Sequence, residues 1–501
     1  MTHILIMVII APLAAAVAGS IAVYWSERLL RCVVAASAFA HAVFVTSIIV
    51  YVGDEGSMLY EVGAWVAPVG IMLYADALSV VILLILSAAH VVLVLHTFSA
   101  ARASRGATWI LVELLVAALS GIVVSGDLFN MFVFLELATV ASIGLVAHKR
   151  SATGAGAGFV YLLFALVSGL LFMIAVVLVY RATGVLSLSG IAAEIDRAPE
   201  QAVRVVAGLL LGSLGIKFGL VPFHFWQAPA YEAAGSSAAA LMSGAGMKVY
   251  LYVLIRLIFH ALRVPVIVPR IGVVLLALGA TSILFGHLLA LAQRDLKRLL
   301  AFSSVAHVGY IFLALAAVSR GGSIGAAAAY GAILHICFHA LMKSTLFYSG
   351  RSMIVRARAS ATERMRGVGR AEPLGFAAFM LAAVALVGIP PTSGFYSKWR
   401  IALDSFAGYG AFPVVVIAAG TVISMLYYAR VLHLGLAEGE RPPVTGAERT
   451  PTAALALVAL LSLGTFSMGV AGPAIEAMLT GAAAVLADPE AILAVTTGGA
   501  A

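Results

Sequence analysis

The feature that most constrains this chain is a succession of apolar runs separated by short polar segments. A helix needs roughly 20 mostly apolar residues to cross a membrane, and by that measure about fourteen runs qualify. These candidate spans are residues 4–25, 31–52, 73–97, 107–125, 128–147, 157–181, 203–226, 237–260, 268–291, 299–318, 323–349, 372–403, 408–434 and 451–472. Only 10% of the residues are charged, against about 25% in soluble chains. We therefore expect an all-α polytopic membrane protein in which residues 1–501 form a single transmembrane domain.

Basic residues gather in alternate loops, which indicates how the chain is oriented. Lys and Arg in short loops mark the cytoplasmic side of a membrane protein. With the N-terminus outside, the inside loops carry Arg28, Arg31, Arg102, Arg105, Lys149, Arg150, Arg294, Lys297, Arg298, Arg351, Arg356, Arg358, Arg364, Arg366 and Arg370. An even number of spans then puts both termini outside the cell membrane of a bacterium or archaeon. The tail after Gly472 is expected to form a further short helix at the membrane interface.

Two candidate spans contain residues that interrupt a helix. They are the seventh run, with Pro222, and the twelfth run, with Pro390, Pro391 and Gly394. A lysine lies close to each interruption, and because the runs are five apart, a five-helix repeat would be inverted. Paired interrupted spans are typical of ion sites near mid-membrane, although such residues also kink membrane helices without a functional role. We expect one half-channel at about 107–260 and a second at about 268–434.

Ionisable side chains lie inside several spans, where a charge costs roughly 2.5–3.5 kcal/mol on insertion scales. The candidates are Glu136, Lys217, Lys248, His335, His339, Lys343 and Lys398. Burial disfavours the charged forms of glutamate and lysine, and histidine titrates near neutral pH, so a row of such groups can pass protons. The alternatives are histidines that pack helices together, a Lys343 that snorkels, and an inert Glu136–Lys217 ion pair. Asp127 is expected to cap a helix.

These residues resemble the antiporter-like subunits shared by Mrp-type cation/proton antiporters, membrane-bound hydrogenases and respiratory complex I. The resemblance covers nearly the whole chain, and Gly126-Asp-Leu-Phe-Asn is nearest to the D-type component of Mrp antiporters. The matching segments are 126–136, 217–226, 243–248, 293–304, 335–343 and 388–398.

The resemblance implies a role for each ionisable residue. Glu136 and Lys217 would form the pair of the first half-channel, and Lys248 would bridge the two half-channels. His335, His339 and Lys343 would form the central axis, and Lys398 would end the second half-channel. Arg256 also fits the family pattern.

Three further residues are candidates for accessory roles. After the first break the family usually has an acid, whereas Gln227 follows here, so Glu232 is the candidate for that role. His224 is either an accessory relay group or a partner for backbone groups freed beside Pro222. Glu113 is either a further relay group or a contact with a partner subunit.

The resemblance favours a proton-translocating subunit of a multisubunit Na⁺/H⁺ antiporter, with H⁺, Na⁺, lipid and other membrane subunits as partners. The alternative is a proton-pumping subunit of a hydrogenase- or NADH dehydrogenase-type complex. The chain carries no nucleotide, flavin or iron–sulfur motif, so no cofactor, metal or enzymatic activity of its own is expected. The basic residues lie in loops between spans, which is not the pattern of a nucleic-acid site.

Overall fold

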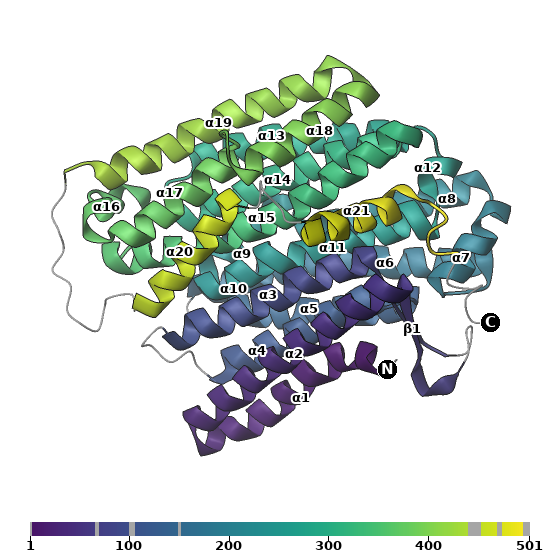
Figure 1. Ribbon diagram of the computed structural model, residues 1–501, viewed down its shortest axis with the longest axis horizontal. Coiled ribbons are helices and arrows are strands. Elements are labelled where there is room, and N and C mark those ends of the chain that lie inside the picture. The colour runs from purple at the N-terminus through teal and green to yellow at the C-terminus, as the bar shows by residue number, and fades with distance from the viewer. Residues whose placement is uncertain are drawn as a thin grey trace.

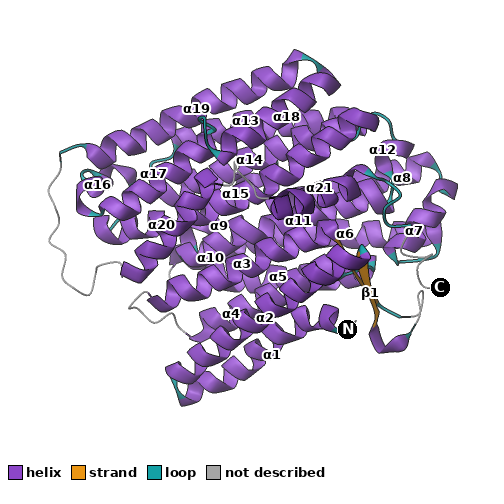
Figure 2. Cartoon of the chain, viewed as in Figure 1, coloured by secondary structure: helices purple, strands orange, loops and turns teal. Residues whose placement is uncertain are grey.

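The computed structural model describes residues 3–65, 70–99, 106–148, 152–438, 452–467 and 473–493, and it is mostly helical (Figures 1 and 2). Within these residues, 12 helices are long and apolar enough to cross a membrane. They are α1 (Ile4–Trp25), α2 (Glu27–Glu55), α3 (Ala77–Ser99), α4 (Gly106–Val124), α5 (Leu128–Ala147), α6 (Ala152–Thr183), α8 (Glu200–Phe218), the segment Ser236–Ala261, α13 (Ile271–Ala292), α14 (Leu296–Val318), α15 (Gly322–Ala357) and α19 (Ala411–Leu436). The expected all-α polytopic fold is confirmed.

The segment Ser236–Ala261 alternates two kinds of helix. It consists of α10 (Ser236–Leu241), a π turn η4 (Met242–Gly246), α11 (Met247–Ile255) and a second π turn η5 (Arg256–Ala261). The remaining short elements are α7 (Leu188–Glu194), η2 (Ile195–Arg197), η3 (His224–Trp226), α9 (Gln227–Ala233), α12 (Val264–Ile267), η6 (Thr362–Met365), α16 (Val368–Ala371), α17 (Pro373–Val387), α18 (Ser393–Tyr409), α20 (Thr452–Ser467) and α21 (Pro473–Ala487).

The observed helices differ from the predicted spans near the C-terminus. The run 372–403 forms two helices, α17 and α18, because the backbone breaks between them. The expected short helix after Gly472 forms as α21, but it packs along α3 and α15 within the bundle, so the prediction of an interfacial helix is wrong. The apolar face of α21 packs against these two long helices. Composition alone does not show that such packing partners are available.

A small hairpin between α2 and α3 was not expected from the sequence. Strands β1 (Ser57–Glu61) and β2 (Met72–Asp76) pair antiparallel, with Leu59 opposite Tyr74, and η1 (Val62–Ala64) follows β1. The third span therefore begins at Ala77 rather than at residue 73. The apolar residues of β2 are buried, so hydropathy could not separate this strand from the helix that follows.

Two five-helix units repeat the same backbone contacts at opposite ends of the bundle. Asp127 caps α5 by accepting a hydrogen bond from the Asn130 backbone N–H at 2.8 Å, and Asp295 caps α14 in the same way. Each cap residue also forms an isolated antiparallel bridge, to Ser187 and to Ala361 respectively. The first bridge lies beside α7 and the second beside η6 and α16, which occupy opposite ends in Figure 1. The repeat is therefore inverted, as an odd number of helices requires.

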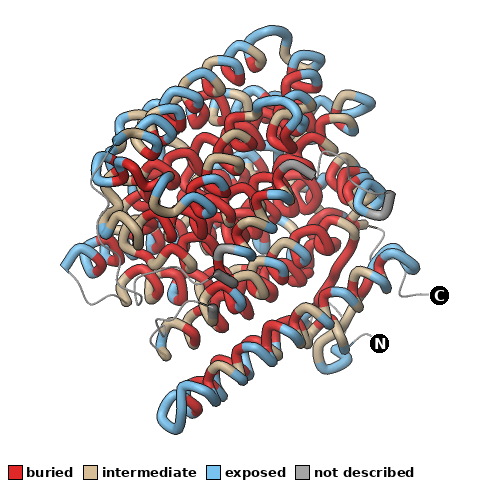
Figure 3. Tube along the Cα trace, turned by 60° about the vertical axis from the view of Figure 1, so that its left-hand side comes forward, coloured by how far each residue is buried: buried red, intermediate tan, exposed pale blue. Residues whose placement is uncertain are grey.

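Buried residues gather in the middle of the bundle, and exposed ones lie around its outside (Figure 3). In the segment Ser236–Ala261 and in helix α14, every residue of the apolar 18-residue stretch is buried. Both helices carry polar side chains among their apolar residues, and these side chains form much of the site described below.

The orientation of the bundle follows from its basic loops and is open to a direct test. Of the basic residues in the predicted inside loops, Arg102, Arg105, Lys149 and Arg150 lie outside the described residues. We expect Glu363→Cys, whose native side chain is 69% exposed, to react with an impermeant thiol reagent only from the cytoplasmic side.

The chain has two cysteines, Cys32 and Cys337, so the background is removed with Cys32→Ser and Cys337→Ser. Glu55→Cys, in an acidic loop, is the matched control and should react from outside. Labelling of position 363 from outside intact cells would overturn the orientation.

Candidate functional site

Both interrupted helices end at a glycine with a left-handed backbone. Gly219 has φ +71° and follows α8, and Gly388 has φ +84° and follows α17. A helix end leaves backbone carbonyls without intrahelical partners. Beyond the first break, Trp226 Nε1 donates to the Ile216 carbonyl at 2.7 Å. Beyond the second, Lys398 Nζ donates to the Val387 carbonyl at 3.0 Å. Each break therefore recruits a polar side chain to the end of the preceding helix.

The Glu136–Lys217 contact expected from the sequence is present. Lys217 Nζ lies 3.2 Å from Glu136 Oε1 and also donates to Thr139 Oγ1. A Cβ at Gly169 of α6 would lie 3.1 Å from Glu136 Oε1, so the glycine leaves room for the carboxylate. Helices α5 and α8 thus bring together two charges that are far apart in sequence.

The two members of this pair differ in exposure. The Lys217 side chain is 2% exposed and the Glu136 side chain 36%. Phe129, Val133 and Val140, on the same face of α5, are also exposed. A pair that belongs to a half-channel is expected to face the interior of the bundle, but the Glu136 carboxylate opens onto the lateral surface of this chain. Glu136 is three, four and seven residues from Val133, Val140 and Phe129, so its side chain lies on the same outward face of the helix.

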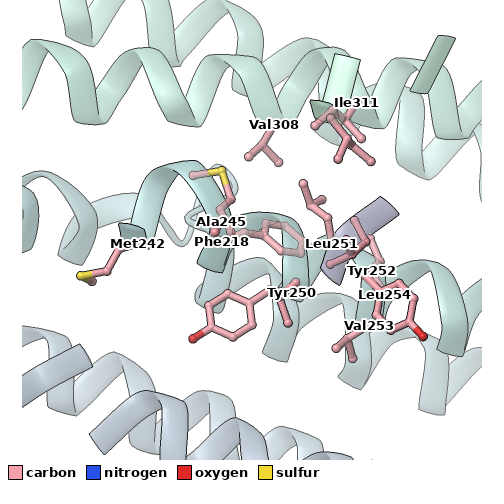
Figure 4. Packing of buried hydrophobic residues seen from close by; sticks show 14 of the residues in the cluster. Phe218, Met242, Ala245, Tyr250, Leu251, Tyr252, Val253, Leu254, Val308 and Ile311 are labelled. Carbon is pink, nitrogen blue, oxygen red and sulfur yellow. The ribbon is translucent and has the colours of Figure 1, made fainter. Parts of the chain in front are cut away.

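A small cavity lies between Lys217 and the segment that carries Lys248. Its volume is about 10 Å³, which is close to the least that holds one water. Its lining includes Lys217 from α8, Gly246 from the π turn and Met247, the neighbour of Lys248. Around this segment, apolar side chains such as Phe218, Leu251 and Val308 are packed from three helices (Figure 4).

Lys248 follows the π turn η4 and is fully buried. Its Nζ donates to the Ser243 carbonyl at 2.6 Å, five residues earlier in the chain. Ser243 Oγ in turn lies 3.0 Å from Ser304 Oγ of α14. A π turn shifts carbonyls out of the α-helical pattern and is frequent at functional sites. Here it supplies the carbonyl that holds the lysine.

Histidines from three helices form a compact cluster at the centre of the second repeat. His335 Nε2 lies 3.1 Å from His307 Nδ1, and His335 Nδ1 lies 3.0 Å from Ser397 Oγ. The His339 ring stacks on His307 with centroids 4.9 Å apart, and neither His339 nitrogen has a hydrogen-bond partner among the described residues. His335 and His339 are four residues apart on one face of α15, and both belong to one aromatic stack.

A second arm of the cluster leads to Lys398. His287 lies between two tyrosines, with Nδ1 3.1 Å from Tyr427 Oη and Nε2 3.2 Å from Tyr310 Oη. Lys398 Nζ lies 4.5 Å from the centroid of the Tyr310 ring. The ring centroids of His287 and His307 are 5.9 Å apart. His287 and its two tyrosines are therefore in contact with the group formed by His307, His335 and His339.

Lys343 is fully buried and points into the bundle. Its Nζ donates to the Leu300 carbonyl at 2.8 Å and to Ser303 Oγ, both on α14. A snorkelling lysine would place its ammonium at the surface. That alternative is therefore wrong for Lys343.

The accessory candidates lie apart from one another. His224 is buried in η3 and stacks on Phe225, and its Nδ1 has no partner among the described residues. Trp226 serves the Ile216 carbonyl freed at this break, and His224 interacts with the backbone of Pro222. Glu232 Oε2 accepts from Arg298 Nη1 at 2.9 Å near the basic end of the bundle. Glu113 is fully buried, so the expectation that it could contact a partner subunit is wrong.

Arg256 forms a buried ion pair with Asp76 at the end of β2. Sequence reasoning missed Asp76, together with Thr139, His287, Ser303, His307, Tyr310 and Tyr427. The two histidines had a usable signal, since both lie inside candidate spans. The neutral hydroxyl groups had none, because such side chains are common in membrane helices.

An inverted-repeat bundle with two broken helices and a buried row of lysines and histidines defines a membrane subunit of the ion-transport class. Residues 125–424 match the family model described as "NADH:quinone oxidoreductase/Mrp antiporter, TM", and the chain belongs to this family.

Relatives of both kinds named in that description align along most of the chain. The N-type component of the NADH-quinone oxidoreductase of Desulforudis audaxviator is 32% identical over 490 residues, which cover 93% of this chain and 95% of that protein. The D-type component of the Na(+)/H(+) antiporter of Bacillus subtilis is 28% identical and covers 98% of each chain. A chain in the structure of the Mrp complex from Dietzia superposes with a TM-score of 0.88 at 25% identity, covering 98% of this chain and 99% of that one.

Proposed function

We propose that this chain translocates protons along its buried axis as a subunit of a multisubunit monovalent cation (Na⁺)/H⁺ antiporter. The observation that carries the proposal is the row of titratable side chains between the two breaks. The row runs from Lys217 through Lys248 and the histidine cluster to Lys398, and all these side chains are at most 5% exposed. Ionisable residues inside a membrane are expensive and usually line an ion pathway.

The first step of the proposed mechanism takes place at the Glu136–Lys217 pair. A nearby carboxylate favours the protonated lysine, and separation of the pair favours release of its proton. A tenfold change in proton affinity corresponds to about 1.4 kcal/mol, so a modest change in the 3.2 Å contact is enough to gate the transfer. The small cavity beside Lys217 leads the proton toward Lys248.

Within the second half of the chain, the histidine cluster would relay the proton toward Lys398. Each histidine can accept a proton at one ring nitrogen and donate from the other. His335 and His287 already have a neighbour at both nitrogens. Residues 107–260 would then act as one half-channel and residues 268–434 as the other. Lys248 of the first range and the histidines and Lys343 of the second would form the axis that joins the two half-channels.

The assignment to an antiporter rests on two supports. The segment Gly126-Asp-Leu-Phe-Asn resembles the D-type component of Mrp antiporters, and the corresponding antiporter protein of Bacillus subtilis aligns over nearly its full length. A second candidate function is a proton-pumping subunit of a redox-driven complex, which the 32% identity to a component of an NADH-quinone oxidoreductase favours. The exposed face of α5 with Glu136 suits a neighbouring membrane subunit in either assembly.

Cation exchange in membrane vesicles separates these two functions. The complete complex is produced in a host that lacks its own Na⁺/H⁺ antiporters, and a pH gradient is set up across inside-out vesicles. We expect added Na⁺ to dissipate the gradient when no electron donor for the complex is present. Vesicles without the complex are the control. If Na⁺ has no effect, and oxidation of an electron donor by the complex builds a gradient instead, the redox-driven function is the correct one.

A further inference from the structure

A second group of buried titratable side chains lies in α2, α3 and α4, away from the axis described above. Glu113 of α4 is fully buried, and its two carboxylate oxygens have different partners. Oε2 accepts from Ser37 Oγ of α2 at 2.7 Å, and Oε1 lies 3.1 Å from His90 Nε2 of α3. Among the described residues, these are the hydrogen-bond and ion-pair partners of Glu113. A buried carboxylate with one histidine and one hydroxyl has the parts needed to bind and release a proton.

A second histidine extends this group. His41 of α2 is fully buried, and its Nε2 lies 3.1 Å from Ser120 Oγ of α4. The rings of His41 and His90 are 5.7 Å apart. The titratable groups that face Glu113 are therefore His90 from α3 and His41 from α2. Inert packing of three helices requires none of these residues.

A cavity lies between this group and the basic end of the bundle, next to the residues that flank the Glu113–His90 pair. Its volume is about 160 Å³, which is room for several waters. Leu93 and Val112 line it; Val112 precedes Glu113, and Leu93 follows His90 by three residues and so shares its side of α3. The cavity therefore reaches the helical turns that carry the Glu113–His90 pair.

The lining of the same cavity indicates that it holds water. Thr97 and Ser237 both line it, and the hydroxyl oxygens of both are buried without a hydrogen-bond partner among the described residues. Buried polar atoms are nearly always hydrogen-bonded, to protein or to ordered water. Arg351 and His148 also line the cavity. Arg351 lies near the end of α15 that the distribution of basic residues places on the cytoplasmic side.

Polar residues follow one face of α3 from this cavity toward the other end of the helix. At 100° per residue, Ser79, Ser87, His90 and Thr97 lie within one face about 80° wide, and they span about 27 Å along the axis. Ser79 at the far end bonds to Asp76 and to Tyr252. Leu83 lies on the same face between Ser79 and Ser87, and Val94 lies on it between His90 and Thr97, so apolar side chains interrupt the polar face on both sides of His90.

We propose that Glu113 and His90 form a second proton-binding site, which exchanges protons with cytoplasmic water through the cavity lined by Thr97 and Ser237. The proposal rests on the proposed function, because it adds a proton site to a proton-translocating chain. The reaction is a proton transfer alone: a proton from water in the cavity binds the Glu113–His90 pair and leaves by the same kind of transfer, and no other bond changes.

The test is infrared difference spectroscopy of the reconstituted complex, at rest and during cation-driven turnover. Groups whose protonation changes in turnover contribute carboxyl signals to the difference spectrum. We expect one such signal to disappear in Glu113→Gln, which keeps the shape of the side chain but cannot bind a proton. The transport rate should fall about 100-fold or more, because a positioned acid–base group is lost. Glu27→Gln, an exposed carboxylate of α2 paired with Arg31, is the matched control and should keep both the signals and the rate.

A cavity variant tests the route independently of the pair. Ser237→Leu fills part of the cavity and leaves Glu113 and His90 in place, so transport should slow while the Glu113 carboxyl signal is retained. An unchanged set of carboxyl signals in Glu113→Gln would overturn the second site, whatever happens to the rate. If Glu136→Gln stops transport while Glu113→Gln behaves as wild type, the second site fails and the proposed function stands. If Na⁺ fails to dissipate the pH gradient in wild-type vesicles, the proposed function itself fails, whatever the Glu113 carboxyl signal shows.

Discussion

Transport by the complete complex is expected to stop when Glu136 is replaced by glutamine. Glu136→Gln keeps the size of the side chain and removes the charge that lies 3.2 Å from Lys217 Nζ. Without that carboxylate the lysine loses the partner that favours its protonated form. We expect the transport rate to fall by about 100-fold or more, in the range found for positioned acid–base groups. Cation-driven pH changes in vesicles measure the rate, and the amount of assembled complex is measured on the same membranes.

Two further variants ask whether the pair acts as one unit. Lys217→Ala should be as damaging as Glu136→Gln, and combining them should be no worse than either alone, because residues that share one step are not additive. Lys217→Arg keeps the positive charge but cannot release a proton at working pH, so it should also be inactive. Glu200→Gln, at an exposed carboxylate paired with Arg204, is the matched control. Wild-type transport in Glu136→Gln, or additive losses in the double variant, would contradict a shared step.

The sequence was most informative about features that carry a high free-energy cost. A charge in a membrane helix is expensive, so Glu136, Lys217 and Lys248 stood out, and the structure brings the first two into contact. The breaks at Pro222 and Pro391 were readable because proline and glycine interrupt a helix. Both breaks occur where predicted, each next to a glycine with positive φ.

Contacts that depend on which helices pack together could not be predicted from the sequence. His287 and Tyr427 are 140 residues apart and touch only because α13 packs against α19. Placing a serine, threonine or tyrosine hydroxyl in a membrane helix costs little free energy, and such residues are common there. The sequence therefore did not mark Ser303, Thr139 or Tyr310 as members of the site. Exposure was also hidden, because spacing alone does not say which face of α5 turns outward. For the same reason Glu113 had two interpretations until its burial removed one of them.

The second half of the chain offers the other variant with a large expected effect, Lys398→Ala. Lys398 is 5% exposed, and its Nζ binds the Val387 carbonyl and lies over the Tyr310 ring. It is therefore held between the broken end of α17 and the histidine cluster, where a proton leaving the cluster would pass. Its removal should lower transport by about 100-fold or more, with the complex still assembled, because the truncation leaves carbonyls near a helix end that water can reach.

Lys398→Arg separates proton transfer from a purely electrostatic or structural role. Arginine keeps the positive charge and can still donate to the Val387 carbonyl, but it does not give up a proton. If Lys398 carries protons, both Lys398→Ala and Lys398→Arg should be inactive in cation/proton exchange. If it only neutralises the broken helix end, Lys398→Arg should transport at close to the wild-type rate. Arg320→Ala, at an exposed basic residue that stacks on Tyr409 near the end of α18, is the control and should leave the rate unchanged. A fully active Lys398→Arg would end the proton pathway before Lys398 and leave the histidine cluster as its last member in this chain.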